Sequence, residues 1–223
     1  LWPGMPARGP ELVCIRNDLH TVKNPRKILM PQLFLPMLAL LTGVAGPALS
    51  ADFHKALDAA KRGDYAIALK EWEPLAERGH VIAQFNLGLL FERTDQASRD
   101  FKSALKWYTR AAGQGHAVAQ FNLGGMYANG RGVGQDQGTA AFWYNLAAEQ
   151  GLAGAQLKLA FLYVQGAGIP KNFMRAHMWF TIAAPMVGET ARAGRIIVEN
   201  LMTEAQIADA RILARAWMEQ HKK

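Results

Sequence analysis

Apolar and small residues recur along this chain with a period of 36 residues. Three segments of similar sequence start at Gly79, Gly115 and Gly151 and read GHVIAQFNLGLLF, GHAVAQFNLGGMY and GLAGAQLKLAFLY. A second register with the same step carries alanine in four successive units and tryptophan in the last three of them. Two registers that share one period predict a repeat architecture. The positions that keep the period are Ala68, Ala104, Ala140 and Ala176, Gly79, Gly115 and Gly151, Leu87, Leu123 and Leu159, Tyr127 and Tyr163, and Trp107, Trp143 and Trp179.

Each unit predicts two amphipathic helices. In the first helix, Ala104, Trp107 and Ala111 fall at i, i+3 and i+7, and in the second, Ala119 and Leu123 fall at i and i+4. Both spacings place these side chains on one face of an α-helix. The recurring glycines lie between the two helices, where a left-handed residue commonly follows a helix end. Because one pair cannot bury its apolar face alone, we expect successive pairs to stack into a solenoid.

Capping and turn residues mark where the helices begin and end. Asp64, Asp100 and Asn172 are placed to cap the first helix of their units. The segments 129–136 (NGRGVGQD) and 165–172 (QGAGIPKN) are rich in turn formers, so we expect loops there between units.

Both ends of the stack need terminal helices. A segment from Asp52 can form an initial helix, and Thr203 with Gln206 has the spacing of a capping box before a final helix. The fold prediction is therefore all-α, an α-solenoid of about four helix-turn-helix repeats over 51–202, with a C-terminal capping helix and tail over 203–223.

The first fifty residues have the pattern of a targeting segment. Three basic residues between positions 23 and 27 precede an apolar run from Leu33 to Val44, and small residues precede Ala51. This order is typical of a signal peptide, for which we predict cleavage after Ser50, with the residues before about Val22 an over-extended N-terminus. A membrane anchor or a buried helix is the alternative, but the run is short for a bilayer of ~30 Å. We expect a periplasmic or secreted protein without a stable membrane anchor after processing.

Composition limits the possible classes of function. Half of the residues are apolar and 19% are charged, which excludes a disordered chain. Part of the net charge of +7 lies before residue 51 and the rest is scattered along the chain, without a basic stripe and interleaved aromatics, so we expect no nucleic-acid partner. The single cysteine, Cys14, excludes a disulfide framework or a cysteine-based zinc site within one chain.

The sequence contains no convincing reaction centre. His80 and His116 share a repeat position, but neighbouring repeats lie roughly 8–10 Å apart, so we interpret both as surface turn residues and not as a metal pair. His54, His177 and His221 have no matching partners. The segment GRGVG lacks the Lys-Ser/Thr pair of a phosphate loop, and the carboxylates at positions 71, 73 and 77 are typical of a solvated helix face. We therefore expect no catalytic residues, no metal and no cofactor.

Polar positions on the predicted helices are the candidates for partner contact. The recurring tryptophans could stack on sugars, but their strict period favours packing between helices. The candidate partner-binding residues are Lys106, Arg110, Asn145 and Arg175 on the first helices and Asn86 and Asn122 on the second helices.

The repeat resembles the Sel-one-like repeat (SLR) family, a relative of tetratricopeptide repeats. That family's pattern runs A-x-x-x-L-G-x-x-Y, then G-x-G-V, then A-x-x-W-Y-x-x-A-A-x-x-G. The third unit departs from it at Ala160, which replaces a glycine, and the first unit lacks the glycine-rich loop. The matching residues of the middle unit are Ala119, Leu123, Gly124, Tyr127, Gly130, Gly132, Val133, Ala140, Trp143, Tyr144, Ala147, Ala148 and Gly151.

This resemblance covers roughly residues 51–219 and implies a right-handed superhelix whose concave face binds a protein or peptide. It implies a non-catalytic adaptor, here in the bacterial cell envelope. The alternative is an envelope hydrolase or β-lactam-binding protein, as associated with cysteine-rich members of this repeat family. Those members depend on a disulfide in each repeat, which this chain cannot form.

Overall fold

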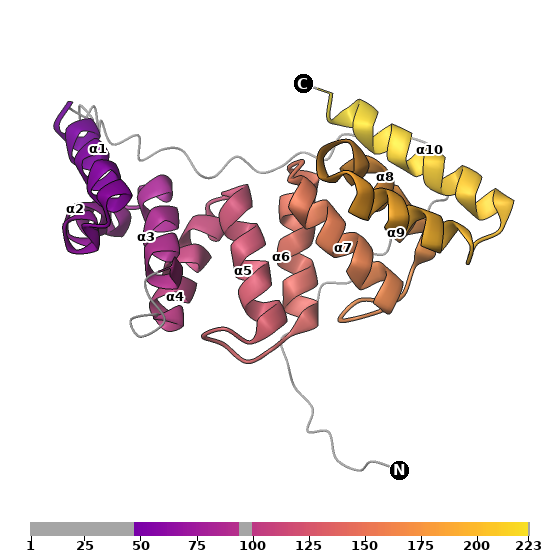
Figure 1. The fold of residues 1–223 in the computed structure, drawn as a ribbon, viewed down its shortest axis with the longest axis horizontal. Helices are drawn as coiled ribbons and strands as arrows, with labels where there is room; N and C mark the ends of the chain where they lie inside the picture. The colour runs from indigo at the N-terminus through magenta and orange to yellow at the C-terminus, as the bar shows by residue number, and fades with distance from the viewer. Residues whose placement is uncertain (1–46, 94–99, 223) are drawn as a thin grey trace, which may run out of the picture. The chain divides into compact units, whose positions relative to one another are not determined.

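The computed structural model describes residues 47–93 and 100–222, and within these ranges all regular structure is helical (Figure 1). This confirms the all-α prediction. The predictions that concern residues 1–46, including the apolar run and Cys14, lie outside the described residues. The helices are α1 (Pro47–Arg62), α2 (Tyr65–Glu77), α3 (Val81–Arg93), α4 (Phe101–Gly113), α5 (Ala117–Asn129), α6 (Gln137–Glu149), α7 (Ala153–Gln165), α8 (Phe173–Val187), α9 (Glu189–Glu199) and α10 (Glu204–Gln220).

From α1 to α9 each helix packs against the next one along the chain (Figure 1). We call α2, α4, α6 and α8 the first helices of the four repeats, and α3, α5, α7 and α9 the second helices. Helix α1 precedes the first repeat and packs on α2. The final helix α10 turns back and packs on α8. The predicted four helix pairs with a terminal helix at each end are thus present.

The residues that keep the period of 36 form the interior of the stack. Alanine in this position is small enough to let helices approach closely, which is why large residues do not replace it. Tyr127, Tyr163 and Trp143 are only half-buried and pack at the edge of the core. The repeat positions with at most 3% exposure are Ala68, Ala104, Ala140 and Ala176, Leu87, Leu123 and Leu159, and Trp107 and Trp179.

The turn between the two helices of a repeat requires glycine. Gly79, Gly115 and Gly151 have φ of 94°, 87° and 87°, in the left-handed region that other residues avoid. The backbone N–H of the following residue donates back to a carbonyl in the last turn of the first helix, for example His116 N–H to the Ala111 oxygen at 3.1 Å. These glycines follow the helices as predicted.

Two of the three predicted aspartate and asparagine caps are confirmed. The Asp100 carboxylate accepts from the backbone N–H of Lys102 and Ser103, and Asn172 accepts from the N–H of Arg175. The prediction for Asp64 is wrong in its chemistry, because its side chain makes no cap hydrogen bond and accepts from Arg62 Nε instead.

Two further caps lie at the starts of α6 and α10, and only the cap of α10 was predicted from the sequence. Asp136 caps α6 by accepting from Gly138 N–H at 2.8 Å and Thr139 N–H at 3.1 Å. At the start of α10, the Thr203 hydroxyl accepts from Gln206 N–H while the Gln206 side chain accepts from Thr203 N–H. This reciprocal pair is the predicted capping box.

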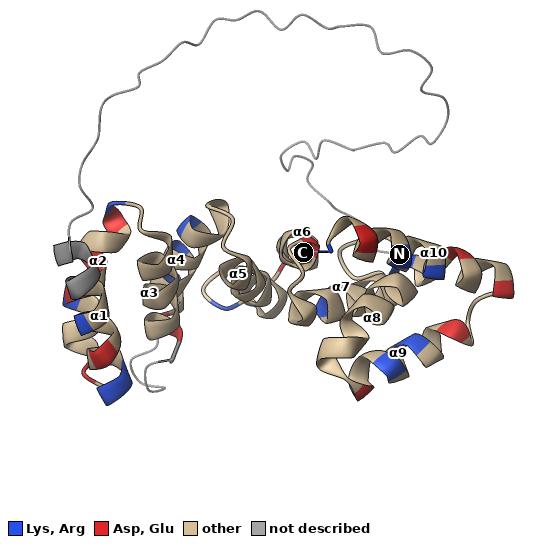
Figure 2. Cartoon of the chain, turned by 90° about the horizontal axis from the view of Figure 1, so that it is seen from above, with Lys and Arg blue, Asp and Glu red and all other residues tan. Residues whose placement is uncertain are grey.

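Charged residues are concentrated on the terminal helices. Figure 2 shows Lys, Arg, Asp and Glu along α1 and α2 and along α9 and α10, whereas α5 carries none and α6, α7 and α8 carry one each. Terminal helices have a water-facing side that no further repeat covers, and charges there keep it solvated. Among the described helices, none is long and apolar enough to cross a lipid bilayer.

Candidate functional site

A row of buried glutamines runs through the interior from repeat to repeat, and we call it the glutamine ladder. Gln84, Gln120 and Gln156 are 2–4% exposed and occupy the same position on α3, α5 and α7. Gln84 receives a hydrogen bond from Gln114 Nε2, and Gln120 receives one from Gln150 Nε2, each at 2.7 Å. A buried amide is stable only when hydrogen-bonded, so this ladder fixes the spacing of adjacent repeats.

The other end of each ladder amide ties the two helices of a repeat together. The Nε2 groups of Gln84, Gln120 and Gln156 donate to the carbonyls of Ala76, Ala112 and Ala148 at 2.9, 3.1 and 3.2 Å. Those alanines lie in the last turn of the preceding first helix. Sequence reasoning missed this role, although the Ala-Gln dipeptide recurs at the period of 36 and was the available signal.

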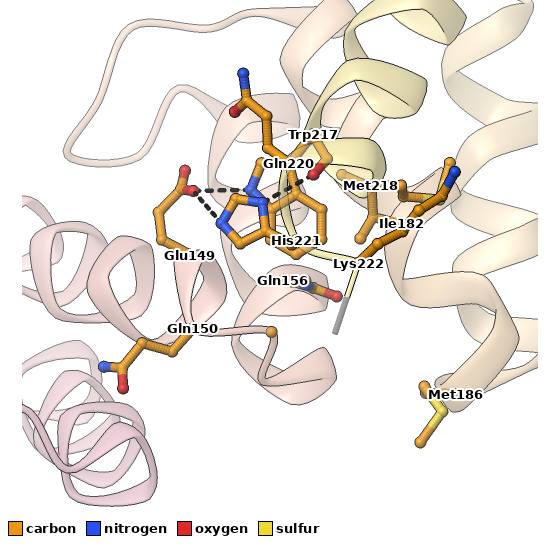
Figure 3. A pocket seen from close by; sticks show the side chains of 11 residues that line it. Glu149, Gln150, Gln156, Ile182, Met186, Trp217, Met218, Gln220, His221 and Lys222 are labelled. Carbon is orange, nitrogen blue, oxygen red and sulfur yellow. Dashed lines mark hydrogen bonds and ion pairs between the residues drawn. The ribbon is translucent and has the colours of Figure 1, made fainter.

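A pocket of about 810 Å³ lies at the C-terminal end of the ladder. Figure 3 shows it between the end of α6, the start of α7, the end of α8 and the end of α10. We call it the C-terminal pocket. Its walls combine apolar side chains with amides and a few charges. The lining residues are Glu149, Gln150, Gly151, Gln156, Ile182, Met186, Trp217, Met218, Gln220, His221 and Lys222.

Helix α10 is held at the rim of this pocket by Trp217. Its indole Nε1–H donates to the Glu149 carboxylate at 2.7 Å, and its ring stacks on His221 with centroids 4.0 Å apart. His221 Nδ1 donates to the Trp217 carbonyl at 2.8 Å, and His221 Nε2 lies 3.9 Å from Glu149 (Figure 3). These contacts join α10 to α6, a helix 68 residues earlier.

Lys106 and Arg110, two of the predicted partner-binding residues, share one carboxylate. Lys106 Nζ and Arg110 Nη1 lie 3.1 and 2.5 Å from Glu77, at the end of α2. Hydrogen bonds from Arg110 and then Lys106 hold the pKa of Glu77 below its usual value. Both cations also lie over the Trp107 ring, 4.4 and 5.0 Å from its centroid. All three charged residues are exposed, which leaves a cationic patch across two repeats.

The other four candidates do not join this patch. Arg175 is exposed, donates to the Tyr163 hydroxyl at 3.4 Å and lies over its ring. Asn86, Asn122 and Asn145 are half-buried. Their role in binding a partner remains a prediction.

The outer positions of the first helices form a row along the stack, which we call the first-helix face. The side chains in this row change from charged to apolar along the chain. Lys106 of α4 is replaced 36 residues later by Phe142 of α6, which is 55% exposed. The next equivalent, Met178 of α8, is only 9% exposed, and Ile182, which lies at the position equivalent to Arg110, is only 8% exposed. They belong to the core cluster against which Trp217 and Met218 of α10 pack. Helix α10 therefore covers this face at α8 and leaves it open at α6 and α4.

The interpretation of His80 and His116 needs a correction. Both lie in the turn, as predicted, but each Nδ1 accepts from a backbone N–H and so caps the second helix, at 3.2 Å for Ala83 and 3.1 Å for Ala119. The half-buried His116 ring stacks on Phe85 with centroids 4.5 Å apart, and burial lowers its pKa. The neutral ring is therefore a structural cap.

His177 has a partner that the sequence did not reveal. It is fully buried on α8, and its Nε2 donates to the Glu199 carboxylate of α9 at 2.8 Å. Arg195 and Arg211 lie 3.7 and 3.5 Å from the same carboxylate. The hydrogen bond from His177, followed by these positive charges, lowers the pKa of Glu199. This cluster joins α8, α9 and α10, and we treat it as structural.

The carboxylates of α2 lie on a solvated face, as predicted. Glu73 and Glu77 are exposed, and Glu71 pairs with Lys55 of α1 at 2.6 Å. Across the described ranges, no group of three or more His, Cys, Asp or Glu side chains could hold a metal ion.

Known proteins similar to this chain share its repeat. A protective antigen present in uropathogenic Escherichia coli strains, which displays an SLR fold, is 26% identical with a TM-score of 0.54, over 77% of this chain and 45% of the antigen. The chain therefore spans less than half of that protein's length. A Sel1 repeat protein from Oxalobacter formigenes is 27% identical with a TM-score of 0.62, over 76% of this chain and 71% of that protein. No curated protein sequence matches significantly.

The Sel1 repeat family matches three consecutive segments, residues 81–116, 117–152 and 153–184. Each matched segment begins at a second helix and ends in or just after the first helix of the next repeat, so it contains the loop between repeats, which is rich in glycine in the second and third segments. Proteins of this family are commonly non-catalytic scaffolds for protein interaction. The structure, the structural neighbours and the three matched segments together show that this chain is built on consecutive Sel1 repeats.

Proposed function

We propose that this protein is a non-catalytic adaptor that binds a partner protein or peptide along the first-helix face, which we take to be the concave face of the superhelix. The observation that supports the proposal most directly is the packing of α10. The chain's own final helix packs on this face at α8, while the equivalent surface of α6 exposes Phe142 at 55%. A partner segment that lies beside α10 would bury this apolar side chain.

The neighbouring charges indicate what the partner carries. Beyond Phe142, the face continues to Lys106 and Arg110, which together exceed the single charge of Glu77. We therefore expect an apolar side chain at Phe142, followed by acidic side chains that approach the two cations. The predicted signal peptide supports a location in the bacterial envelope, and both structural neighbours come from bacteria.

Affinity capture with paired variants of the full chain tests the proposal. Phe142→Asp places a charge on the open face, whereas Lys158→Asp changes an exposed residue of the second helix α7. Envelope proteins that bind the natural chain should also bind Lys158→Asp but should be lost, by about tenfold or more, with Phe142→Asp. Equal capture by both variants would show that the partner uses another surface.

A further inference from the structure

The glutamine ladder ends with an unpaired acceptor. Gln114 and Gln150 each donate to the ladder glutamine of the preceding repeat, at 2.7 Å. The position 36 residues after Gln150 is Met186, near the end of α8. A thioether cannot donate a hydrogen bond, so the third ladder glutamine, Gln156, does not receive the bond that the first two receive.

Gln156 is nevertheless as deeply buried as its equivalents. Its side chain is 2% exposed and donates through Nε2 to the Ala148 carbonyl at 3.2 Å. Over the described residues, no donor is paired with its Oε1. Figure 3 shows the carboxamide inside the C-terminal pocket, whereas Met186 lies apart from it at the open edge and is 81% exposed. Oε1 is not among the fully buried side-chain atoms that lack a partner, so it is accessible from the pocket, where a ligand that brings a donor can bond to it in place of water.

The rest of the pocket limits the kind of ligand. Ile182, Trp217 and Met218 supply apolar walls, and the Glu149 carboxylate at the rim already accepts from the Trp217 indole. The volume of about 810 Å³ lies within the range of roughly 300–1,000 Å³ typical of ligand sites and exceeds what one side chain fills. The pocket therefore accommodates a short peptide segment with apolar residues beside its hydrogen-bonding group.

We propose that the C-terminal pocket binds a peptide segment that inserts the primary carboxamide of a glutamine and donates a hydrogen bond to Gln156 Oε1. In this position the ligand replaces the side chain that Gln114 and Gln150 provide in the first two repeats. Apolar residues of the segment pack on Trp217 and Met218. The site lies apart from Phe142 and Lys106 and goes beyond the adaptor function proposed for the first-helix face.

Three probes test the chemistry on the full chain. The first is the capped tripeptide acetyl-Leu-Gln-Leu-N-methylamide, the second replaces glutamine by glutamate, and the third is free L-glutamine. Binding is followed by NMR through the indole Nε1–H signal of Trp217 and the methyl signal of Met186. We expect the glutamine peptide to shift both signals saturably, and the other two probes to bind at least tenfold more weakly. A carboxylate opposes the Gln156 and Glu149 oxygens, and the free amino acid lacks the apolar neighbours.

A matched pair of variants tests the site. Met186→Gln places an amide donor at the position equivalent to Gln114 and Gln150. We expect this side chain to turn inward, donate to Gln156 Oε1 and reduce binding of the glutamine peptide by tenfold or more. Ile197→Gln adds a glutamine at a 60% exposed position of α9 outside the pocket and should bind as the natural chain does.

Several results would overturn this inference. They are equal binding of the glutamine and glutamate peptides, equal binding of free glutamine, unchanged binding to Met186→Gln, or no shift at peptide concentrations up to about 10 mM. Capture of an envelope partner that Phe142→Asp abolishes would survive each of them, so the adaptor function and the glutamine pocket can fail separately.

Discussion

Small residues opposite aromatic rings set how closely adjacent repeats approach. A Cβ built on Gly88 would lie 2.5 Å from the Tyr108 ring, and one built on Gly124 would lie 2.9 Å from the Tyr144 ring. Both glycines are helical and both rings are buried, so neither ring can move away from an added Cβ without repacking of the core. The third repeat has the buried Ala160 in this place, which shows that the spacing there is adjusted to one more methyl group.

We predict that Gly88→Ala destabilises the protein although alanine is the better helix former. Overpacking should lower the free energy of unfolding by about 1–3 kcal/mol. The control is Gly113→Ala on α4, because a Cβ there meets no atom within 4 Å. That variant should leave stability unchanged or raise it by up to about 1 kcal/mol. Urea unfolding followed by circular dichroism measures both, and equal effects would argue against the close approach.

The His177–Glu199 hydrogen bond makes stability depend on pH. The pKa of Glu199 is below its ordinary value in the folded protein, so the unfolded chain binds the proton more tightly. Stability from this group is therefore present above pH 4.5, the ordinary value, and is lost as pH falls through the lower folded pKa. Burial of His116 acts in the same direction near its ordinary value of 6.5, because its depressed pKa favours the neutral ring.

Glu199→Gln should remove much of this acid sensitivity. The amide can still accept from His177 but carries no charge, so we expect a loss of about 1 kcal/mol at pH 7, after allowing for solvent screening of a partly exposed group. The difference should shrink as pH falls through the lowered folded pKa of Glu199, because the natural carboxyl then also loses its charge. Urea titrations from pH 7 to pH 3 measure it. Glu73→Gln, at an exposed position of α2, should show neither effect.

Helix α10 differs from the other elements because it turns back onto the stack. Trp217 contacts Trp179 of α8, with ring centroids 5.6 Å apart, and hydrogen-bonds to Glu149 of α6. Ala210 and Ala214 are its buried positions, while most of its other face is exposed. The helix thus covers the apolar end of the first-helix face with a charged outer side, which is what a terminal cap requires.

The capping box should contribute measurably to this element. Thr203→Ala removes the hydroxyl that accepts from Gln206 N–H, and we expect a loss of about 1 kcal/mol in the free energy of unfolding. Thr190→Ala on α9 replaces an exposed threonine inside a helix and should be neutral or slightly stabilising. Thermal unfolding of the two variants decides the point, and equal melting temperatures would contradict a role for the box.

Periodicity predicted the helices well because equivalent positions have the same burial or backbone conformation in successive repeats. An alanine at the position of Ala104 is buried in four units and a glycine at the position of Gly115 is left-handed in three, so several copies reinforce one signal. Features that occur once were missed. The Glu199 partner of His177 lies 22 residues away in a helix of different sequence, and no local sequence pattern predicts the contact.

The candidate site was the least predictable part, because it depends on how repeats differ. Lys106 and Arg110 were named from their polarity alone, while Phe142 was overlooked although it occupies the position equivalent to Lys106. The C-terminal pocket depends on the path of α10, which the amphipathic pattern predicts as a helix without indicating where it packs. Comparison of equivalent positions across repeats was the available signal for both surfaces.

At the scale of the whole molecule, the stack separates structural from functional positions. The period of 36 fixes the interior, through alanines, leucines and the glutamine ladder. Charges are concentrated on the terminal helices, whereas α5 to α8 carry few (Figure 2). The exposed positions that break the period, Phe142 and Met186 among them, lie where we propose that partners bind. A partner would therefore contact the residues that vary between repeats.

The most direct test of the adaptor function is a crosslinking map in living cells. A photoreactive amino acid is placed singly on the first helices, at Lys70 or Phe142, and on the second helices, at Ile82 or Lys158, all of which are exposed. We predict a discrete protein adduct from the first-helix positions, strongest at Phe142, and none from the second-helix positions. Adducts confined to Ile82 and Lys158, or none at any position, would contradict it.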